Sequence, residues 1–205
     1  MKKSMLLLTA CLLATCSLFA QNSAAEIGAE IKQTEIEQFI NECSYTKTEF
    51  LEEFKTKSCE MEAIVVTDLI TNRKMGGIHL YARPDIAAAV LSMGASLQTD
   101  GPKDLGYLDV TEIDDVLTVL RQVAAVSNVK AAFPYNITYV SKSDLTIRFS
   151  SALQRLDILR TYKGINSFGT PEYVTYSTHD ITVKEVGKII MKLESAKVKI
   201  EGACK

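Results

Sequence analysis

The chain has two histidines, which limits the metal sites and nucleophilic schemes that it could form. Of its two histidines, His79 lies beside Tyr81 in a strand-like segment, and His179 adjoins Asp180 before the last helical segment. Neither has a second histidine at the spacing that places two metal ligands on one helix face, and the sequence has no paired-cysteine metal motif. A catalytic role for either imidazole therefore requires a carboxylate brought within hydrogen-bond reach by the fold.

Four acidic residues gather where an amphipathic segment begins: Asp109, Glu112, Asp114 and Asp115. Their oxygens could hold a hard cation. Thr111, with Asp114 three residues later, has the spacing of a helix cap, and acidic groups near a helix N-terminus are stabilised by the helix dipole. We therefore interpret the cluster as helix-start chemistry. We expect no metal and no cofactor, since G-x-S-x-G, P-loop and dinucleotide glycine motifs are also missing from the sequence.

Tyrosine is concentrated in the later part of the chain, where seven of the eight occur from Tyr81 onward. Several fall on strand-like segments, and an exposed row of tyrosines would suit binding because each offers a large contact area with a polar tip. Packing of the same rings beneath helices is the alternative. The candidate binding residues are Tyr81, Tyr139, Tyr173, Tyr176 and His79.

The N-terminus has the pattern of an export signal. Lys2 and Lys3 precede an apolar run, Met5–Phe19, that is too short for a membrane-spanning helix. We predict that residues 1–20 are a cleaved signal peptide and that the product is periplasmic or secreted. A lipid anchor on Cys16 is the less favoured alternative, because the preceding residue is a threonine where a smaller one is usual.

Removing residues 1–20 leaves 21 basic and 25 acidic residues, a formal charge of −4. A basic footprint for nucleic acid is therefore not expected, and neither is a transmembrane segment in the mature chain. The partner expected is a protein, a peptide or a carbohydrate.

Three cysteines follow the signal: Cys43, Cys59 and Cys204. In an oxidising compartment the sequence favours a disulfide between Cys43 and Cys59, which would close a loop worth about 3 kcal/mol in chain entropy. The alternative is that all three thiols are reduced, because three cysteines allow three single pairings and spacing does not choose among them.

β-Branched residues at Ala63–Ile70 and alternating apolar and polar residues in the later strands predict two β-hairpins, each followed by a strand and an amphipathic helix. The helices are expected to begin at Thr111 and Thr182, which end the similar tripeptides Asp-Val-Thr and Asp-Ile-Thr. In the second helix, Gly187 is expected to permit close packing on a sheet. The predicted strand pairs are Ala63–Ile70 with Gly76–Ala82 and Asn136–Val140 with Leu145–Phe149.

These elements predict an α+β fold with a mainly antiparallel sheet, helices on one face and a candidate pseudo-duplication of a hairpin-strand-helix unit. The expected organisation is an acidic helical or extended segment at 21–60 and a single domain at 61–205. The candidate repeats within that domain are 61–128 and 133–200.

The missing catalytic motifs and the export signal favour a small exported, non-catalytic binding or interaction module. One alternative is an exported hydrolase-like enzyme, with a histidine and a carboxylate in a cleft bounded by Asp85–Gly106. The other is an envelope lipoprotein with a structural role.

Overall fold

The computed structural model describes residues 32–83, 101–126, 133–165, 169–178 and 181–205. Internal contacts divide the chain into two units: Lys32–Tyr162 with Tyr173–Lys205, and Met1–Ile31 with Lys163–Glu172. The core and every site discussed belong to the first unit. The predicted signal, His179 and most of the predicted cleft-bounding segment lie outside the described residues.

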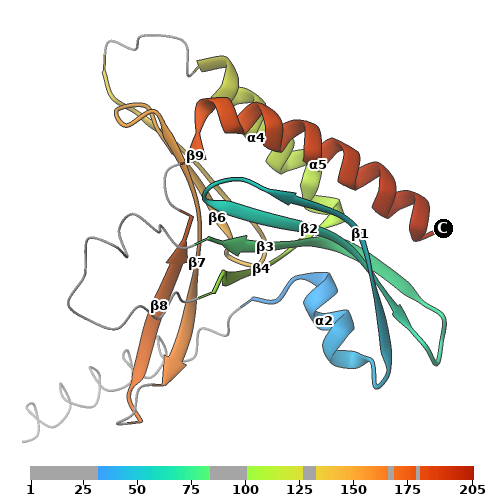
Figure 1. Cartoon of the computed structure of the whole chain (residues 1–205). Helices are drawn as coiled ribbons and strands as arrows, with labels where there is room; N and C mark the ends of the chain where they lie inside the picture. Colours follow the sequence, from blue (N-terminus) through green and yellow to red (C-terminus); the bar gives the residue numbers. More distant parts are fainter. Residues whose placement is uncertain (1–31, 84–100, 127–132, 166–168, 179–180) are drawn as a thin grey trace, which may run out of the picture. The chain divides into compact units, whose positions relative to one another are not determined.

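Sheet A consists of four antiparallel strands in the order β1-β2-β3-β4 (Figure 1). The β2–β3 hairpin confirms the first predicted strand pair, and its turn holds Asn72 at a φ of 57°, a conformation that Asn tolerates better than most residues. The segment after the first helix, which the sequence left as a helix or an extended arm, is the edge strand β1. The strands are β1 Thr46–Lys55, β2 Cys59–Asp68, β3 Lys74–Ala82 and β4 Lys103–Asp109.

Helices pack on both faces of sheet A. On the face that we call inner lie α4 (Ile113–Val126) and α5 (Val183–Ala203), and on the outer face lies the short helix α2 (Glu35–Glu42). Strand residues alternate between the two apolar clusters, as the period of two requires. Met61, Ala63 and Val65 join the large inner core, whereas Ile64 and Val66 join the smaller cluster under α2.

Two consecutive glycines on β3 let helices approach sheet A from opposite sides. A side chain on Gly76 would meet Ile200 and Cys204 of α5, and one on Gly77 would meet Ile36 of α2 and the carbonyl oxygen of Leu108. The backbone thus comes close to both helices because no Cβ intervenes.

Sheet B is also antiparallel and contributes to the large inner core. Its order is β5-β6-β7-β8, and β9 pairs with β7. The β5–β6 hairpin confirms the second predicted strand pair, with Ile147 and Phe149 of β6 and Leu156 and Ile158 of β7 buried in the core. The strands are β5 Asn136–Val140, β6 Thr146–Ser150, β7 Arg155–Ile165, β8 Pro171–Ser177 and β9 Ile181–Thr182.

The two predicted helix starts have different outcomes. Thr182 is the N-cap of α5, where its N–H donates to Glu185 Oε2 at 2.9 Å, as predicted. Thr111 is not a cap, because it lies inside a 3₁₀ turn, η1 (Val110–Glu112), that runs directly into α4. The prediction that Gly187 permits close packing on a sheet is wrong. Gly187 is exposed, and a side chain there would meet nothing within 4 Å.

The α+β fold with antiparallel sheets is confirmed, with the strands divided between two sheets and α2 added on the outer face. The order hairpin, strand, helix occurs twice, as β2-β3-β4-α4 and as β5-β6-β7-α5 with β8 and β9 inserted before α5. None of the helices in the described residues has both the length and the hydropathy needed to cross a membrane.

Candidate binding site on the outer face of sheet A

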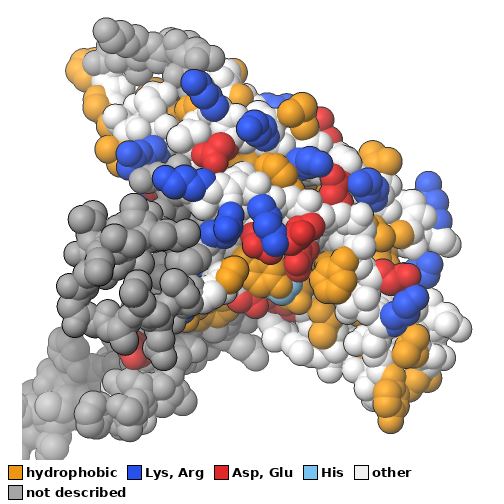
Figure 2. All heavy atoms as spheres, viewed as in Figure 1, with side chains coloured by type: hydrophobic (Ala, Val, Ile, Leu, Met, Phe, Trp, Pro, Cys, Tyr) orange, Lys and Arg blue, Asp and Glu red, His pale blue; other side chains and the backbone are white. Residues whose placement is uncertain are grey.

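Helix α2 covers only one end of the outer face of sheet A. Beneath it lie Ile64, Val66 and Met75, and beyond it the same face of the strands carries polar and aromatic residues. We call these residues the outer-face strip: Glu53, Glu60, Glu62, His79, Tyr81 and Asp104. Figure 2 shows apolar and acidic side chains next to one another on the visible face of the described residues.

His79 is the centre of the strip. Its Nε2 lies 3.0 Å from Asp104 Oδ1 and its Nδ1 lies 2.8 Å from the hydroxyl of Tyr81. Since an ionised carboxylate only accepts, Nε2–H donates to Asp104, and in the neutral ring Nδ1 accepts the Tyr81 O–H. The imidazole is also stacked on Tyr107 at 4.0 Å and tilted against Tyr81 at 4.2 Å between ring centroids. Both nitrogens and the ring are therefore held in place.

A β-bulge in β4 brings Asp104 to this face. Gly106 faces Leu80 and Asp104 faces Tyr81, so Leu105 is an extra residue in the ladder. Gly106 has a φ of 82°, which a glycine adopts without strain, and its N–H donates to Asp104 Oδ1 at 2.6 Å. Without the extra residue the Asp104 side chain would point to the inner face.

The environment of the strip lowers the pKa of Asp104 and raises the pKa values of the two tyrosines beside His79. Partial burial alone would raise the pKa of Asp104, but hydrogen bonds from His79 and from the Gly106 N–H bring it below its usual value. Burial, reinforced by nearby carboxylates such as Glu62 and Asp104, raises the pKa of Tyr81 far above the physiological range, and the pKa of Tyr107 is also raised.

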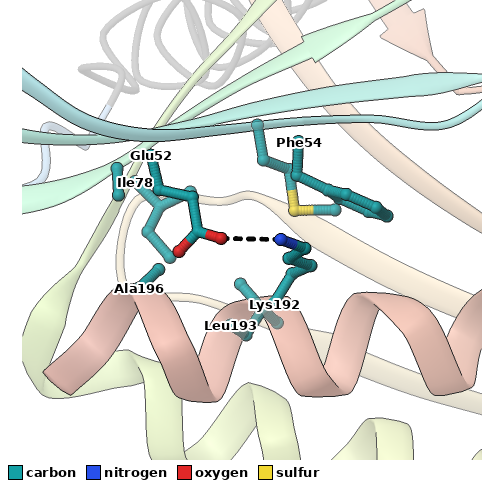
Figure 3. Close-up of a pocket in the computed structure, with 8 residues that line it drawn as sticks. Glu52, Phe54, Ile78, Lys192, Leu193 and Ala196 are labelled. Carbon is teal, nitrogen blue, oxygen red and sulfur yellow. Dashed lines mark hydrogen bonds and ion pairs between the residues drawn. The ribbon is translucent and has the colours of Figure 1, made fainter. Parts of the chain in front are cut away.

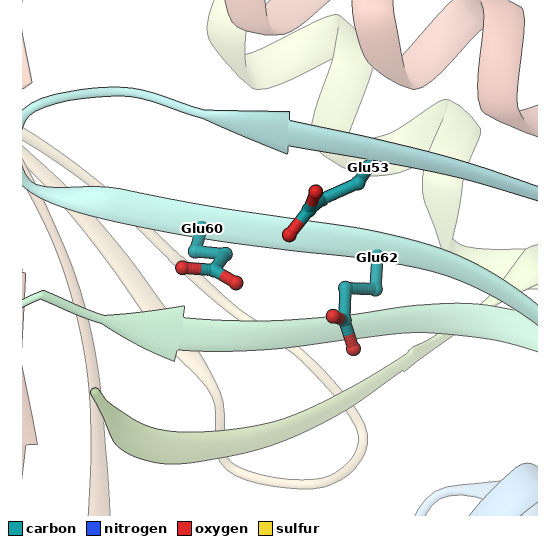
Figure 4. A group of neighbouring side chains, drawn as sticks. All are labelled: Glu53, Glu60 and Glu62. Atoms are coloured by element: carbon teal, nitrogen blue, oxygen red, sulfur yellow. The ribbon is translucent and has the colours of Figure 1, made fainter. Parts of the chain in front are cut away.

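Glu53, Glu60 and Glu62 form the acidic part of the strip (Figure 4), with one carboxylate oxygen from each within 4.8 Å of the others. Such oxygens are the ligands that a hard cation takes. Lys55 already lies among them, paired with Glu53 and, at 3.1 Å, with Glu60. The three glutamates thus already accommodate one ammonium group, that of Lys55. The hydroxyl of Tyr81 lies 3.4 Å from Glu62 Oε2.

The five binding residues predicted from sequence do not form one surface. His79 and Tyr81 are together on the strip. Tyr139 and Tyr176 pack against the large core from sheet B, which is the alternative that the sequence left open, and Tyr173 is exposed on β8. Sequence reasoning missed Asp104, which no local pattern marks, because its position depends on the bulge.

The four acidic residues at 109–115 diverge instead of converging on a cation. Asp109 accepts the N–H groups of Glu35 and Ile36 at 2.8 and 3.0 Å, so it caps α2 and not the helix that follows it. Glu112 Oε1 accepts the N–H of Lys142, and Asp114 pairs with Lys197. Asp109, Glu112 and Asp114 therefore act as capping or pairing groups, but with distant partners that the sequence does not indicate.

A second feature is a small pocket under α5, lined by Glu52, Phe54 and Lys192 among others (Figure 3). A bulge at Leu51 turns Glu52 to the inner face, where it accepts from Lys192, Ser195 and Lys199. The pocket volume is about 10 Å³, room for one water molecule, and the contacts of Glu52 across it join β1 to α5.

The predicted Cys43–Cys59 disulfide is not formed. All three described cysteines are free, and Cys43 belongs to the cluster under α2 whereas Cys59 is buried in the inner core. The two thiols therefore lie on opposite faces of sheet A, because Cys59 falls on the inward phase of β2.

Comparison of the chain with protein-family models, with curated proteins and with solved structures finds no match.

Proposed function

We propose that the protein is an exported, non-catalytic binding module whose outer-face strip takes up a cationic segment of a partner protein or peptide. The carrying observation is that four carboxylates surround the His79–Tyr81 pair on a sheet face that α2 leaves uncovered. Export is supported by the N-terminal pattern of Lys2, Lys3 and the apolar run after them.

The chemistry of the strip suits lysine and arginine side chains. Ionised carboxylates accept charge-assisted hydrogen bonds from ammonium and guanidinium groups, and tyrosine rings attract the same cations through their π faces. Lys55 between Glu53 and Glu60 gives an internal example of this recognition.

A titration with a labelled Lys- and Arg-rich peptide tests the proposal. The double variant Glu60→Gln with Glu62→Gln should weaken binding by about tenfold, and raised salt should weaken binding by the wild type. The matched control is Glu194→Gln with Glu201→Gln on α5, which changes the net charge equally but away from the strip and should change binding less than about twofold.

Equal loss in both double variants would show attraction by net charge alone and would contradict the assignment of the strip. Salt-insensitive binding of a neutral oligosaccharide, with no binding of the basic peptide, would replace the cationic partner with a carbohydrate. The mass of the mature N-terminus tests export: cleavage after Ala20 supports it, and a diacylglyceryl cysteine would instead support the envelope-lipoprotein alternative.

The hydrolase-like alternative gains one observation, the 3.0 Å contact between His79 and Asp104. A general base must present one nitrogen to the group that it deprotonates. Here Nε2 faces Asp104 and Nδ1 faces Tyr81, so the resting arrangement leaves neither nitrogen for a nucleophile or a water. Ester hydrolysis that is lost in His79→Gln but kept in the matched variant Tyr173→Phe would favour the enzyme.

A further inference from the structure

The first half of β1 is exposed to solvent on both faces of sheet A. Residues 46–50 are all exposed, although they alternate between the two faces of sheet A, so neither α2 nor α5 covers this part of the strand. Beyond β1 the sheet has no further strand in the described residues, since the order begins with β1 (Figure 1). Tyr45 and Phe50 are 67% and 68% exposed, and Leu69 and Ile70 of the nearby turn are also exposed. This corner of the sheet therefore combines a strand edge with apolar side chains.

The backbone groups that face away from the sheet can be assigned. Tyr45 accepts the N–H of Leu69 at 3.0 Å, and Thr46 faces Asp68 in the ladder. In an antiparallel pair, alternate residues direct both backbone groups to the neighbouring strand. Tyr45, Lys47 and Glu49 thus bond toward β2, whereas Thr46, Thr48 and Phe50 direct their N–H and C=O groups outward. The bulge at Leu51 ends this regular stretch.

We propose that two copies of the chain pair antiparallel through this stretch, with the twofold axis at Thr48, so that sheet A continues from one copy into the other. In this register Thr48 faces Thr48, and Thr46 faces Phe50 of the second copy. The outward groups of all three residues are then satisfied. An open strand edge presents unpaired N–H and C=O groups that are a template for pairing with another chain.

Charge selects this register over its neighbours. With the axis at Thr48, Lys47 of each copy faces Glu49 of the other, and opposite charges across a ladder are favourable. Moving the axis by one residue places Lys47 against Lys47 in one direction and Glu49 against Glu49 in the other, which is unfavourable. Within one copy Lys47 and Glu49 are already paired at 2.9 Å, so their charged groups lie on the same side of the strand. Charged side chains on an edge strand often prevent pairing with another chain, but in this register Lys47 and Glu49 of the two copies attract each other.

Disulfide trapping tests the register with a matched control. In a background with Cys43 and Cys204 changed to Ser, Thr48→Cys should form a covalent dimer on mild oxidation, because residues facing each other in a ladder have the Cα separation that a disulfide needs. Thr46→Cys is the control, since its counterpart in the second copy is about 14 Å away along the strand. Equal trapping of both variants, or trapping of neither, overturns the proposal.

A charge exchange tests the same register without cysteine. Sedimentation of the purified wild type should show a monomer-dimer equilibrium. Lys47→Glu should weaken the dimer by about tenfold because it creates two like-charge contacts, and Lys47→Glu with Glu49→Lys should restore it. Thermal unfolding of each variant separates loss of pairing from loss of the fold. A wild type that stays monomeric at every concentration, or a double exchange that does not restore association, overturns the proposal.

Discussion

The guanidinium of Arg160, on β7, occupies the position that the Cβ of any other residue at Gly106 would take. The Arg160 side chain is 2% exposed. Its guanidinium donates to both carboxylate oxygens of Glu37, at 2.7 and 3.1 Å, and to the carbonyl oxygen of Leu105 at 3.4 Å. Glu37 also completes the capping box of α2 by accepting the N–H of Thr34. Arg160 of sheet B thus joins α2 to the β4 bulge. The contact is at Leu105, the extra residue that turns Asp104 toward the strip.

Gly106→Ala should destabilise the protein by about 3 kcal/mol or more. An alanine at positive φ costs about 1 kcal/mol, and its Cβ would displace Arg160 from Glu37, which leaves a largely buried carboxylate without its main partner. Urea unfolding measures the difference. Gly101→Ala is the control, because a side chain there meets nothing within 4 Å. Equal stability of the two variants would contradict the role assigned to the bulge.

The two hairpins and the helices after them could be predicted from local patterns in the sequence. The strip could not, because its geometry depends on a bulge and on contacts between residues far apart in the chain. Alternation of apolar and polar residues marks β3, β5 and β6, whereas β-branched residues mark β2. A bulge inserts one residue and reverses the faces beyond it, so no alternation rule tells that Asp104 points outward. Arg160 and Glu37 are 123 residues apart and also leave no local signal. The capping box at Thr34 and Glu37 was not predicted, although a threonine three residues before a glutamate is a local signal of a helix start.

Glycine substitutions at two positions should have opposite effects. Gly187→Ala should stabilise the protein by about 1 kcal/mol, because the site is exposed in the interior of α5 and alanine has the higher helix propensity. Gly77→Ala should destabilise it by about 2 kcal/mol, because the new Cβ would lie 2.9 Å from the carbonyl oxygen of Leu108. Chemical unfolding of both variants checks the signs. A destabilised Gly187→Ala would support the close packing that the sequence suggested and the structure does not show.

Stability should fall in acid partly through Glu52. Hydrogen bonds from Lys192 and Lys199 lower the pKa of its carboxyl from 4.5 to about 2. Because the pKa is lower in the folded state, the contribution is complete above pH 4.5 and is lost as the pH falls toward 2. We expect about 1 to 2 kcal/mol, reduced by solvent screening around the lysines.

The unfolding free energies of the wild type and Glu52→Gln, measured across this range, should therefore converge as the pH falls. Glu201→Gln, on the exposed side of α5, is the control and should show a much smaller difference from the wild type. A difference between the wild type and Glu52→Gln that does not vary between pH 6 and 2 would contradict the role of the lysine contacts.

The three described cysteines should differ in reactivity because the fold places them differently. Burial, with a smaller contribution from Glu60, raises the pKa of Cys59 to about 12, so its reactive thiolate is scarce at neutral pH and is also inaccessible. Cys43 and Cys204 are partly exposed, and their pKa values are raised by burial to a lesser degree. Alkylation of the native protein followed by mass spectrometry should label Cys43 and Cys204 first, and Cys59 only after unfolding. Recovery of a Cys43–Cys59 disulfide peptide from the native protein would contradict the structure, because the two side chains point to opposite faces of sheet A and one strand face would have to reverse to join them.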